Sequence, residues 1–189
     1  TNVTLSNNRG VSAPSVDAEG GAIYNTNYGK LYLYNSTITQ NYARVAGGIA
    51  NRSTSTLVEL TNTILAGNTA DYPATDCRGT LVSQNHNLIG NPYGMQPQLP
   101  CSVSLKSQDL VGVDPLLGAL AQSGALSFHP LLNSSPAVDR ADDADCPSID
   151  SLGTPRPMGA ACDIGAIELE PLVMPKNMTP RLYLPMVKR

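Results

Sequence analysis

Two sequence blocks, Gly20-Gly-Ala-Ile-Tyr-Asn25 and Asn35-Ser-Thr-Ile-Thr-Gln-Asn41, return further along the chain as Gly47-Gly-Ile-Ala-Asn51 and Asn62-Thr-Ile-Leu-Ala-Gly-Asn68. Because both pairs share the same offset of about 27 residues, they indicate an internal repeat. Repeats of this length are typical of solenoid proteins, in which each repeat forms one coil and stacks on the next. The repeat therefore predicts a solenoid.

Apolar and polar residues alternate inside each repeat. Leu31 and Leu33 align with Val58 and Leu60, while the residues between them are Tyr or Glu. An alternation with a period of two is typical of a strand with one buried face. The composition agrees, because Asn, Ser, Thr and Gly disfavour helices and only 14% of the residues are charged. We therefore expect an all-β chain that forms a parallel β-helix.

The repeat also defines the expected domain boundaries. An earlier copy in residues 2–8 precedes an inserted loop around residues 9–19, and a weaker copy runs through residues 80–90. Beyond about residue 91 the period is lost, and Pro, Gly and Ser interrupt short apolar runs. We expect about three to four coils in residues 1–91, an irregular cap on the coil end and flank in residues 92–168, and an extended Pro-containing tail in residues 169–189.

Asparagines recur at two positions of the repeat. Asn35 aligns with Asn62, and Asn41 aligns with Asn68. Stacked side-chain amides in successive coils form hydrogen-bonded ladders like those of cross-β stacks. We therefore predict two asparagine ladders at these bends. The glycine pairs at 20–21 and 47–48 recur with the same period and indicate tight bends rather than phosphate loops.

The four cysteines, Cys77, Cys101, Cys146 and Cys162, are far apart, and no C-x-x-C pair points to a zinc or redox site. An even number of cysteines in a loop-rich chain favours disulfides and an oxidising compartment. Of the three pairings that four cysteines allow, we favour the sequential one, Cys77 with Cys101 and Cys146 with Cys162, which would brace the cap. Four free thiols are the alternative. No signal peptide opens the chain, so we expect a mature or truncated form of an exported protein.

Charge and hydropathy exclude two classes of partner. The formal net charge is -3, and the 12 Lys and Arg residues are scattered along the chain. Without a basic stripe for a phosphate backbone, we expect no nucleic-acid binding. No apolar run approaches the roughly 18 residues of a membrane-spanning helix, so we expect no transmembrane span. The most apolar late stretch, residues 182–187, is interrupted by Pro185 and fits a docking tail or a β segment.

Several motifs occur in an order that resembles a known family. The order is Asn35-Ser-Thr-Ile38, Asn62-Thr-Ile-Leu-Ala-Gly-Asn68, Asn87-Leu-Ile-Gly90, Asp114-Pro-Leu-Leu-Gly118, Ser135-Pro-Ala-Val-Asp139 and Cys162-Asp-Ile-Gly-Ala-Ile-Glu168. Residues 1–168 are similar to bacterial surface β-helix proteins with polymorphic-outer-membrane-protein-like repeats and a C-terminal choice-of-anchor domain. The resemblance implies a right-handed parallel β-helix, export and surface attachment, and it implies no reaction.

One position departs from that family. The family usually has an Arg before the Gly of its D-x-R-G motif, whereas this chain has Leu152 before Gly153. The resemblance therefore leaves open whether Asp150 pairs with an Arg inside the cap.

Candidate catalytic groups are sparse. A glycosidase needs two carboxylates that face one groove, and Glu59 is the only acid on the repeat strands. His86 and His129 lack the sequence context of a nucleophile. We therefore expect no enzyme and no cofactor, with a fragment of a polysaccharide lyase or hydrolase as the alternative. One acidic group fits either a loosely bound Ca²⁺ or a solvated loop, and it comprises Asp139, Asp142, Asp143 and Asp145.

Four tyrosines near the first repeat, Tyr24, Tyr28, Tyr32 and Tyr34, predict a surface that binds glycans or a protein. We expect a non-catalytic structural protein of the cell exterior or cell surface, serving adhesion or as an envelope or assembly scaffold. It would be the C-terminal part of a longer precursor. The alternative is a filament or membrane-complex subunit that associates through its N-terminal coil face and its C-terminal tail.

Overall fold

The computed structural model of the protein describes residues 1–11, 17–52, 55–72, 76–92 and 101–170. Within these ranges the chain is all-β, and its one helix is a three-residue 3-10 turn, Asp143–Asp145. Most of the strands pair in parallel. The predictions of an all-β chain and of parallel strands are therefore confirmed. The strands, in chain order, are β1 Thr4–Ser6, β2 Ile23–Asn25, β3 Lys30–Tyr34, β4 Thr37–Thr39, β5 Tyr42–Ala43, β6 Ile49–Asn51, β7 Leu57–Thr61, β8 Ile64–Leu65, β9 Thr69–Ala70, β10 Cys77–Asn85, β11 Leu88–Ile89, β12 Cys101–Ser104, β13 Leu110–Val111, β14 Ala121–Ser123 and β15 Leu126–Phe128.

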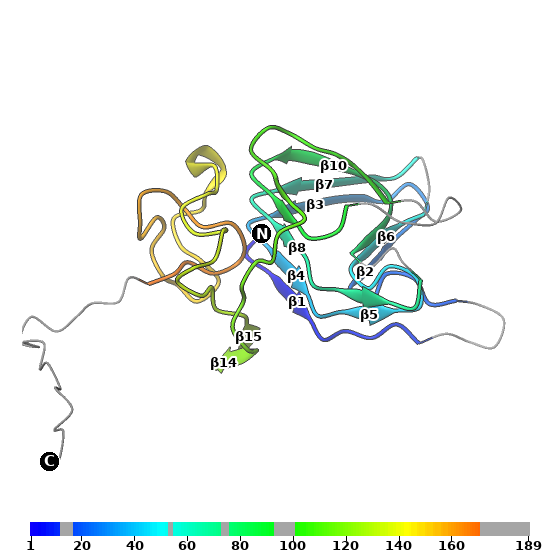
Figure 1. Cartoon of the computed structure of the whole chain (residues 1–189), viewed down its shortest axis with the longest axis horizontal. Helices are drawn as coiled ribbons and strands as arrows, with labels where there is room; N and C mark the ends of the chain where they lie inside the picture. The colour runs from blue at the N-terminus through cyan, green and yellow to red at the C-terminus, as the bar shows by residue number, and fades with distance from the viewer. Residues whose placement is uncertain (12–16, 53–54, 73–75, 93–100, 171–189) are drawn as a thin grey trace, which may run out of the picture.

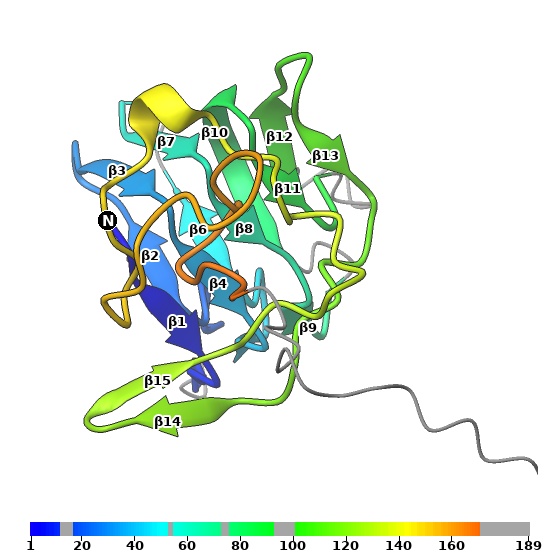
Figure 2. The ribbon, with the colours of Figure 1, turned by 90° about the vertical axis from the view of Figure 1, so that its left-hand side faces the viewer.

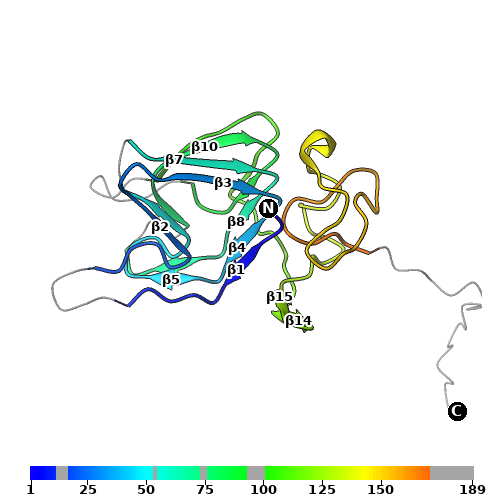
Figure 3. The ribbon, with the colours of Figure 1, turned by 180° about the vertical axis from the view of Figure 1, so that it is seen from behind.

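Two curled sheets of parallel strands enclose a common interior (Figures 1 and 3). One sheet has the order β1-β4-β8-β11-β13, and the other has the order β2-β6-β10-β7-β3 with β12 also paired to β10. Strand β10 serves both halves of the second sheet, because its first residues pair with β6 and its later residues pair with β7. The short parallel pair β5-β9 lies at the bend between the two sheets.

Strand register follows the sequence repeat. Strands β3 and β7 pair at an offset of 27 residues throughout, as do β4 and β8. The offset is 33 residues between β1 and β4, 24 between β8 and β11 and 22 between β11 and β13. The strands therefore stay aligned in parallel while the connections between them change length.

Apolar side chains of successive coils fill the interior. Ile38 pairs with Leu65, and Leu65 pairs with Ile89, so one column of branched side chains runs through three coils. All three are fully buried, as are Leu60 and Leu81 on the facing sheet. Burial of each such side chain stabilises the fold by about 1.5–3 kcal/mol relative to exposure.

The paired coils extend further along the chain than the sequence indicated. We expected them to end at residue 91, but β12 pairs in parallel with β10 and β13 pairs in parallel with β11. The expected boundary is therefore too early. The repeat was missed because Gly79 pairs with Cys101 and Leu88 pairs with Leu110, at offsets shorter than the period of the earlier coils. Most of the predicted tail, residues 171–189, lies outside the described residues.

We call residues 113–170 the C-terminal module. It packs on the flank of the coils, against the outer face of the β1-β4-β8-β11-β13 sheet (Figures 1 and 2). Its buried residues Ala137, Ala141 and Ile164 form one cluster with Ile64 and Leu88 from the coils. The C-terminal module therefore lies on the flank of the paired strands.

Gly165 explains how closely the C-terminal module approaches the sheet. A Cβ atom at this position would lie 2.8 Å from the hydroxyl of Thr37 and 2.9 Å from the Cδ1 of Ile64. Its φ of +109° is also one that L side chains rarely adopt. The backbone of the module therefore lies directly on the sheet, and the next residue, Ala166, donates its N–H to the Thr37 hydroxyl at 3.1 Å.

Both disulfides follow the sequential pairing. Cys77 of β10 is bonded to Cys101 of β12, and Cys146 is bonded to Cys162 within the C-terminal module. The first disulfide therefore joins two neighbouring coils, and only the second braces the module. Among the described residues no helix has the length and apolar character needed to cross a membrane.

One asparagine ladder connects the coils at the bend that follows the first sheet. Asn41 Oδ1 accepts hydrogen bonds from the backbone N–H and the amide of Asn8, at 3.0 and 2.8 Å. Asn68 Oδ1 accepts the equivalent pair from Asn41 at 3.1 and 2.9 Å. Asp76 Oδ1 ends the ladder by accepting both from Asn68, each at 2.9 Å. The predicted Asn41–Asn68 ladder is therefore present, and a carboxylate terminates it.

The predicted ladder between Asn35 and Asn62 is wrong. Both side chains are buried, but their amides leave the stack and bind the C-terminal module. Asn35 Nδ2 donates to the carbonyl of Asp145 at 2.8 Å. Asn62 donates to the carbonyl of Asp142 at 3.0 Å and accepts from the N–H of the same residue at 2.8 Å. The C-terminal module covers this bend and supplies partners for both polar atoms of Asn62 and for the amide nitrogen of Asn35.

A second ladder uses the residue after each of these asparagines. The backbone N–H of Ser36 donates to Thr63 Oγ1 at 3.4 Å, and the N–H of Thr63 donates to Asn87 Oδ1 at 2.9 Å. The N–H of Asn87 then donates to the carboxylate of Asp109 at 2.9 Å. Both ladders thus donate in the same direction along the stack and end on an aspartate.

Candidate functional site

The predicted tyrosine surface is spread over two strands and the turn between them. Tyr24 lies on β2, Tyr32 and Tyr34 lie on β3, and Tyr28 lies in the connecting turn. Tyr24 is 52% exposed, Tyr28 is 78% exposed and Tyr32 is 45% exposed, whereas Tyr34 is half-buried. A cavity of about 370 Å³ is lined by Tyr24 but by none of the other three. Three of the four predicted tyrosines are therefore exposed, and Tyr24 also lines this cavity.

The four aspartates considered for calcium do not form a site in the described residues. Asp139, Asp142 and Asp143 each accept a hydrogen bond from a backbone N–H of the C-terminal module. No group of three acidic, histidine or cysteine side chains arranged for a metal ion occurs in the described part of the chain. The carboxylates of Asp139, Asp142 and Asp143 instead order the loops of the module.

The groups considered for catalysis lie apart or connect structural elements. Glu59 on β7 is in register with Tyr32 on one side and Val82 on the other. His129 is buried and bonds to Ser6 Oγ at 2.7 Å and to the carbonyl of Gly118 at 2.9 Å. His86 bonds to a backbone carbonyl of the C-terminal module at 2.8 Å. Both histidines therefore connect the coils to the module.

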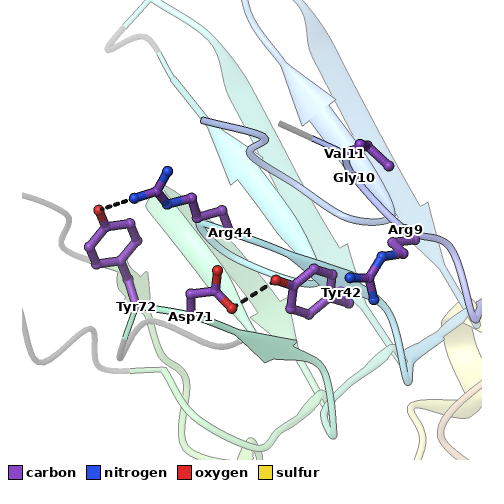
Figure 4. Close-up of a pocket in the computed structure, with 7 residues that line it drawn as sticks. All are labelled: Arg9, Gly10, Val11, Tyr42, Arg44, Asp71 and Tyr72. Atoms are coloured by element: carbon purple, nitrogen blue, oxygen red, sulfur yellow. Dashed lines mark hydrogen bonds between the residues drawn. The ribbon is translucent and has the colours of Figure 1, made fainter. Parts of the chain in front are cut away.

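A pocket that the sequence did not predict lies at the bend occupied by β5 and β9 (Figure 4). Its volume is about 470 Å³. We call it the arginine–tyrosine corner, and it is lined by Arg9, Gly10, Val11, Tyr42, Arg44, Asp71 and Tyr72.

Regular pairing of three coils positions this corner. Arg9 forms a parallel bridge with Tyr42, and Tyr42 of β5 pairs with Thr69 of β9. The inward neighbour Ala43 is fully buried, so the alternation along the strand turns Tyr42 outward. The N–H of Tyr72 donates to the carbonyl of Arg44 at 3.2 Å and fixes the next part of the corner.

The side chains of the corner contact one another in two groups. In the first, the guanidinium of Arg9 lies 4.2 Å from the centre of the Tyr42 ring, and the Tyr42 hydroxyl donates to Asp71 Oδ1 at 2.7 Å. In the second, Arg44 lies 5.6 Å from the centre of the Tyr72 ring and donates to the hydroxyl of that residue at 3.4 Å. Figure 4 shows Asp71 and Tyr42 between the two arginines.

The two arginines differ in charge compensation. Arg44 forms an ion pair with Asp17 at 2.7 Å, and this carboxylate is the main cause that raises the pKa of Arg44. Arg9 forms no ion pair with any described residue. The hydrogen bond to Asp71 raises the pKa of Tyr42, so its hydroxyl stays protonated at neutral pH. The corner therefore holds one uncompensated cation, two aromatic rings and an exposed carboxylate.

This combination suits recognition of a polar ligand. An exposed guanidinium donates in a planar fork that matches carboxylates, and aromatic rings bind the apolar faces of a ligand. A carboxylate such as Asp71 accepts hydrogen bonds from hydroxyl groups.

A second group of charged residues is buried inside the C-terminal module. Arg156 donates to the carbonyls of Asp163 and Gly165 at 2.8 and 2.7 Å and lies 3.4 Å from the carboxylate of Glu168. Burial raises the pKa of Asp163 and of Glu168 and lowers that of Arg156. Asp150 accepts from the N–H of Glu168 at 2.9 Å. The side chains of Arg156 and Glu168 are 0% and 1% exposed, so this group holds the module together and is closed to a ligand.

The corner could have been found by aligning the ladder asparagines. Arg9 and Tyr42 follow Asn8 and Asn41 by one residue, and Asp71 follows Asn68 by three. Positions at one and three residues after a ladder asparagine point outward at the same bend in every coil. No residue type repeats at these positions, so the period alone does not indicate a site there.

Searches with protein-family models, against curated proteins and against solved structures each gave no match for this chain.

Proposed function

We propose that this chain is a non-catalytic adhesive scaffold of the cell exterior, built as a right-handed parallel β-helix, and that it binds surface carbohydrate at the arginine–tyrosine corner. The observation that carries the proposal is the row of Arg9, Tyr42 and Asp71, which come from three successive coils and lie together on an exposed bend. A ligand that spans several coils gains contacts from each of them.

Three further observations support this assignment. The C-terminal module packs beside the β1-β4-β8-β11-β13 sheet (Figure 1), and none of its described residues lines the corner. Two disulfides are typical of proteins that fold in an oxidising compartment. The resemblance to bacterial surface β-helix proteins agrees with a location outside the cell, and carbohydrates are abundant ligands there.

The experiment that tests this function is a glycan array probed with the purified chain, with Tyr72→Ala and Tyr28→Ala as the informative variants. Tyr72 belongs to the corner, whereas Tyr28 is 78% exposed on the tyrosine surface predicted from the sequence. We expect Tyr72→Ala to remove binding and Tyr28→Ala to retain it. The reverse result would transfer the site to the other surface, and release of sugar products on incubation would contradict a non-catalytic role.

Self-association is a second candidate function, and one observation favours it. Strands β2 and β3 lie at the ends of their sheet order, so each has a strand partner on one side only among the described residues. Unpaired strand edges are sites for strand addition by another chain. Sedimentation analysis over a range of concentrations tests this function, and a monomer at every concentration would contradict it.

A further inference from the structure

We infer that the ligand of the arginine–tyrosine corner is an acidic glycan, a chain of sugars that bear carboxylates, and that it lies across the coils. This inference rests on the proposed carbohydrate-binding function and specifies the class of sugar. It follows from the charge state of each corner residue and from the spacing between coils.

Arg9 provides the acid-recognising group. One face of its guanidinium is covered by the Tyr42 ring at 4.2 Å, and its side chain has no carboxylate partner among the described residues. The edges of the guanidinium therefore keep their N–H donors for a ligand. A carboxylate is the group that matches this fork with two parallel hydrogen bonds. Stacking on the ring also limits the conformations of the arginine, so less entropy is lost on binding.

Asp71 and the tyrosine rings favour a sugar over an acidic peptide. Asp71 Oδ1 accepts from the Tyr42 hydroxyl, and its other carboxylate oxygen accepts no hydrogen bond from a described residue. The side chains of polyglutamate present only carboxylates to that oxygen, whereas each sugar of an acidic glycan also carries hydroxyls that can donate to it. The rings of Tyr42 and Tyr72 supply flat apolar surface for the C–H face of a sugar ring.

The coil spacing sets the direction of the chain. Neighbouring strands of a sheet are about 4.8 Å apart. Arg9, Tyr42 and Asp71 come from successive coils, and Figure 4 shows Tyr42 between Arg9 and Asp71. A linear polysaccharide laid across the strands places its carboxylate at Arg9 and hydroxyls of a neighbouring sugar at Asp71.

The test compares three probes by calorimetry: oligomers of galacturonic acid, the same oligomers as methyl esters, and polyglutamate. Methyl esters keep the sugar rings and hydroxyls but lose the negative charge. We expect the acid oligomers to bind more than about tenfold more tightly than the esters, because charge-assisted hydrogen bonds are stronger than neutral ones. Polyglutamate should bind weakly. The affinity for the galacturonic acid oligomers should rise with their length over the first few sugars and then level off.

The decisive variant is Arg9→Gln, which removes the charge and keeps hydrogen-bonding capacity. We expect it to bind acid and ester oligomers equally. Arg140→Gln is the matched control, since Arg140 is an exposed arginine of the C-terminal module and should keep the preference for acid. Thermal unfolding of both variants checks that the coils remain folded.

The outcomes separate the inference from the proposed function. Equal binding of acid and ester by the unmodified chain would overturn the acidic-glycan inference and leave carbohydrate binding in place. Tight binding of polyglutamate that depends on Arg9 would also overturn it, because the sugar would then be dispensable. If none of the three probes binds and a full glycan array is also negative, the proposed function fails together with the inference.

Discussion

The coils and the C-terminal module are stabilised by different interactions. The coils repeat one set of contacts, namely parallel strand pairs, inward aliphatic columns and two side-chain ladders. The module repeats nothing and depends on single residues whose side chains bind backbone groups. Arg156, for example, donates to two carbonyls and neutralises Glu168. In the coils a lost contact has copies above and below it, whereas in the module it has none.

This difference predicts how substitutions affect the stability of each region. A solenoid has approximately additive stability, because each coil contacts only its neighbours. An irregular module with a buried charged network depends on every member of that network. Substitutions of similar size should therefore have local effects in the coils and module-wide effects in the C-terminal module.

Replacement of Arg156 should have the largest effect. We expect Arg156→Met to lower the free energy of unfolding by about 3–5 kcal/mol, because Glu168 would remain as a buried charge without its partner. The measurement is urea unfolding followed by circular dichroism. Arg140→Met, an exposed position of the same module, should change little.

A double variant distinguishes a stranded charge from lost packing. Arg156→Met with Glu168→Gln removes the charge but keeps an oxygen that accepts the N–H of Met158, which donates to Glu168 at 2.9 Å. We expect the double variant to be more stable than Arg156→Met alone. If the two variants are equally unstable, the buried ion pair is not the reason for the loss.

The two disulfides provide the next comparison. Replacing both Cys146 and Cys162 with Ala should cost about 3 kcal/mol, since the bond closes a loop with a sequence separation of 16 residues. Removing the Cys77–Cys101 bond should expose fewer amides, because β10 and β12 remain paired by their backbones. Hydrogen exchange measured by mass spectrometry would show this as loss of protection throughout the C-terminal module in the first case and only near β12 in the second. Equal spread in both cases would contradict the contrast.

The asparagines allow the same contrast at single positions. Asn68→Ala breaks the coil ladder, and Asn62→Gly breaks the bonds to the C-terminal module. Gly is used at position 62 because φ there is +50°, which Gly adopts without strain. Each change should cost about 1–3 kcal/mol, since buried donors or acceptors lose their partners. Hydrogen exchange should increase at the neighbouring coils for Asn68→Ala and across the C-terminal module for Asn62→Gly, and the opposite distribution would refute the assignment of the two asparagine pairs.

The sequence predicted the repeated coils better than it predicted the contacts of the C-terminal module. The constant period and the inward Leu and Val positions sufficed for the paired strands β3, β7, β4 and β8. Periodicity failed at β12 and β13, where the offset between paired strands becomes shorter. It also failed at Asn35 and Asn62, because a repeat reports only what is common to the coils. These two residues bind a module that is not part of the repeat.

The candidate site was missed for a related physical reason. Exposed positions on stacked parallel strands carry no packing constraint, so Arg9, Tyr42 and Asp71 do not share one residue type. Only the stacking of the coils brings them together. The sequence indicated a surface that includes Tyr24 and Tyr32 instead, because a single aromatic residue can be recognised in the sequence without knowing its neighbours in space. A site made of different residues from different coils becomes visible only when the register is known.

The smallest expected effect concerns the aspartate that ends the asparagine ladder. Burial raises the pKa of Asp76 above its ordinary value of 3.8, although three N–H donors from Asn68 and Asn91 act in the opposite direction. The folded state therefore binds this proton more tightly than the unfolded state does, so the contribution to stability is fully present below the ordinary pKa and is lost as pH rises through the raised value. Asp76→Asn removes that titration and should keep an acceptor oxygen for Asn68. We expect the free energy of unfolding of the unmodified chain, relative to that of Asp76→Asn, to fall as the pH rises above the ordinary pKa of 3.8. A relative stability that rises with pH would contradict this prediction. It would mean that the hydrogen bonds from Asn68 and Asn91 lower the pKa of Asp76 by more than burial raises it. The asparagine ladder would then end on a charged carboxylate.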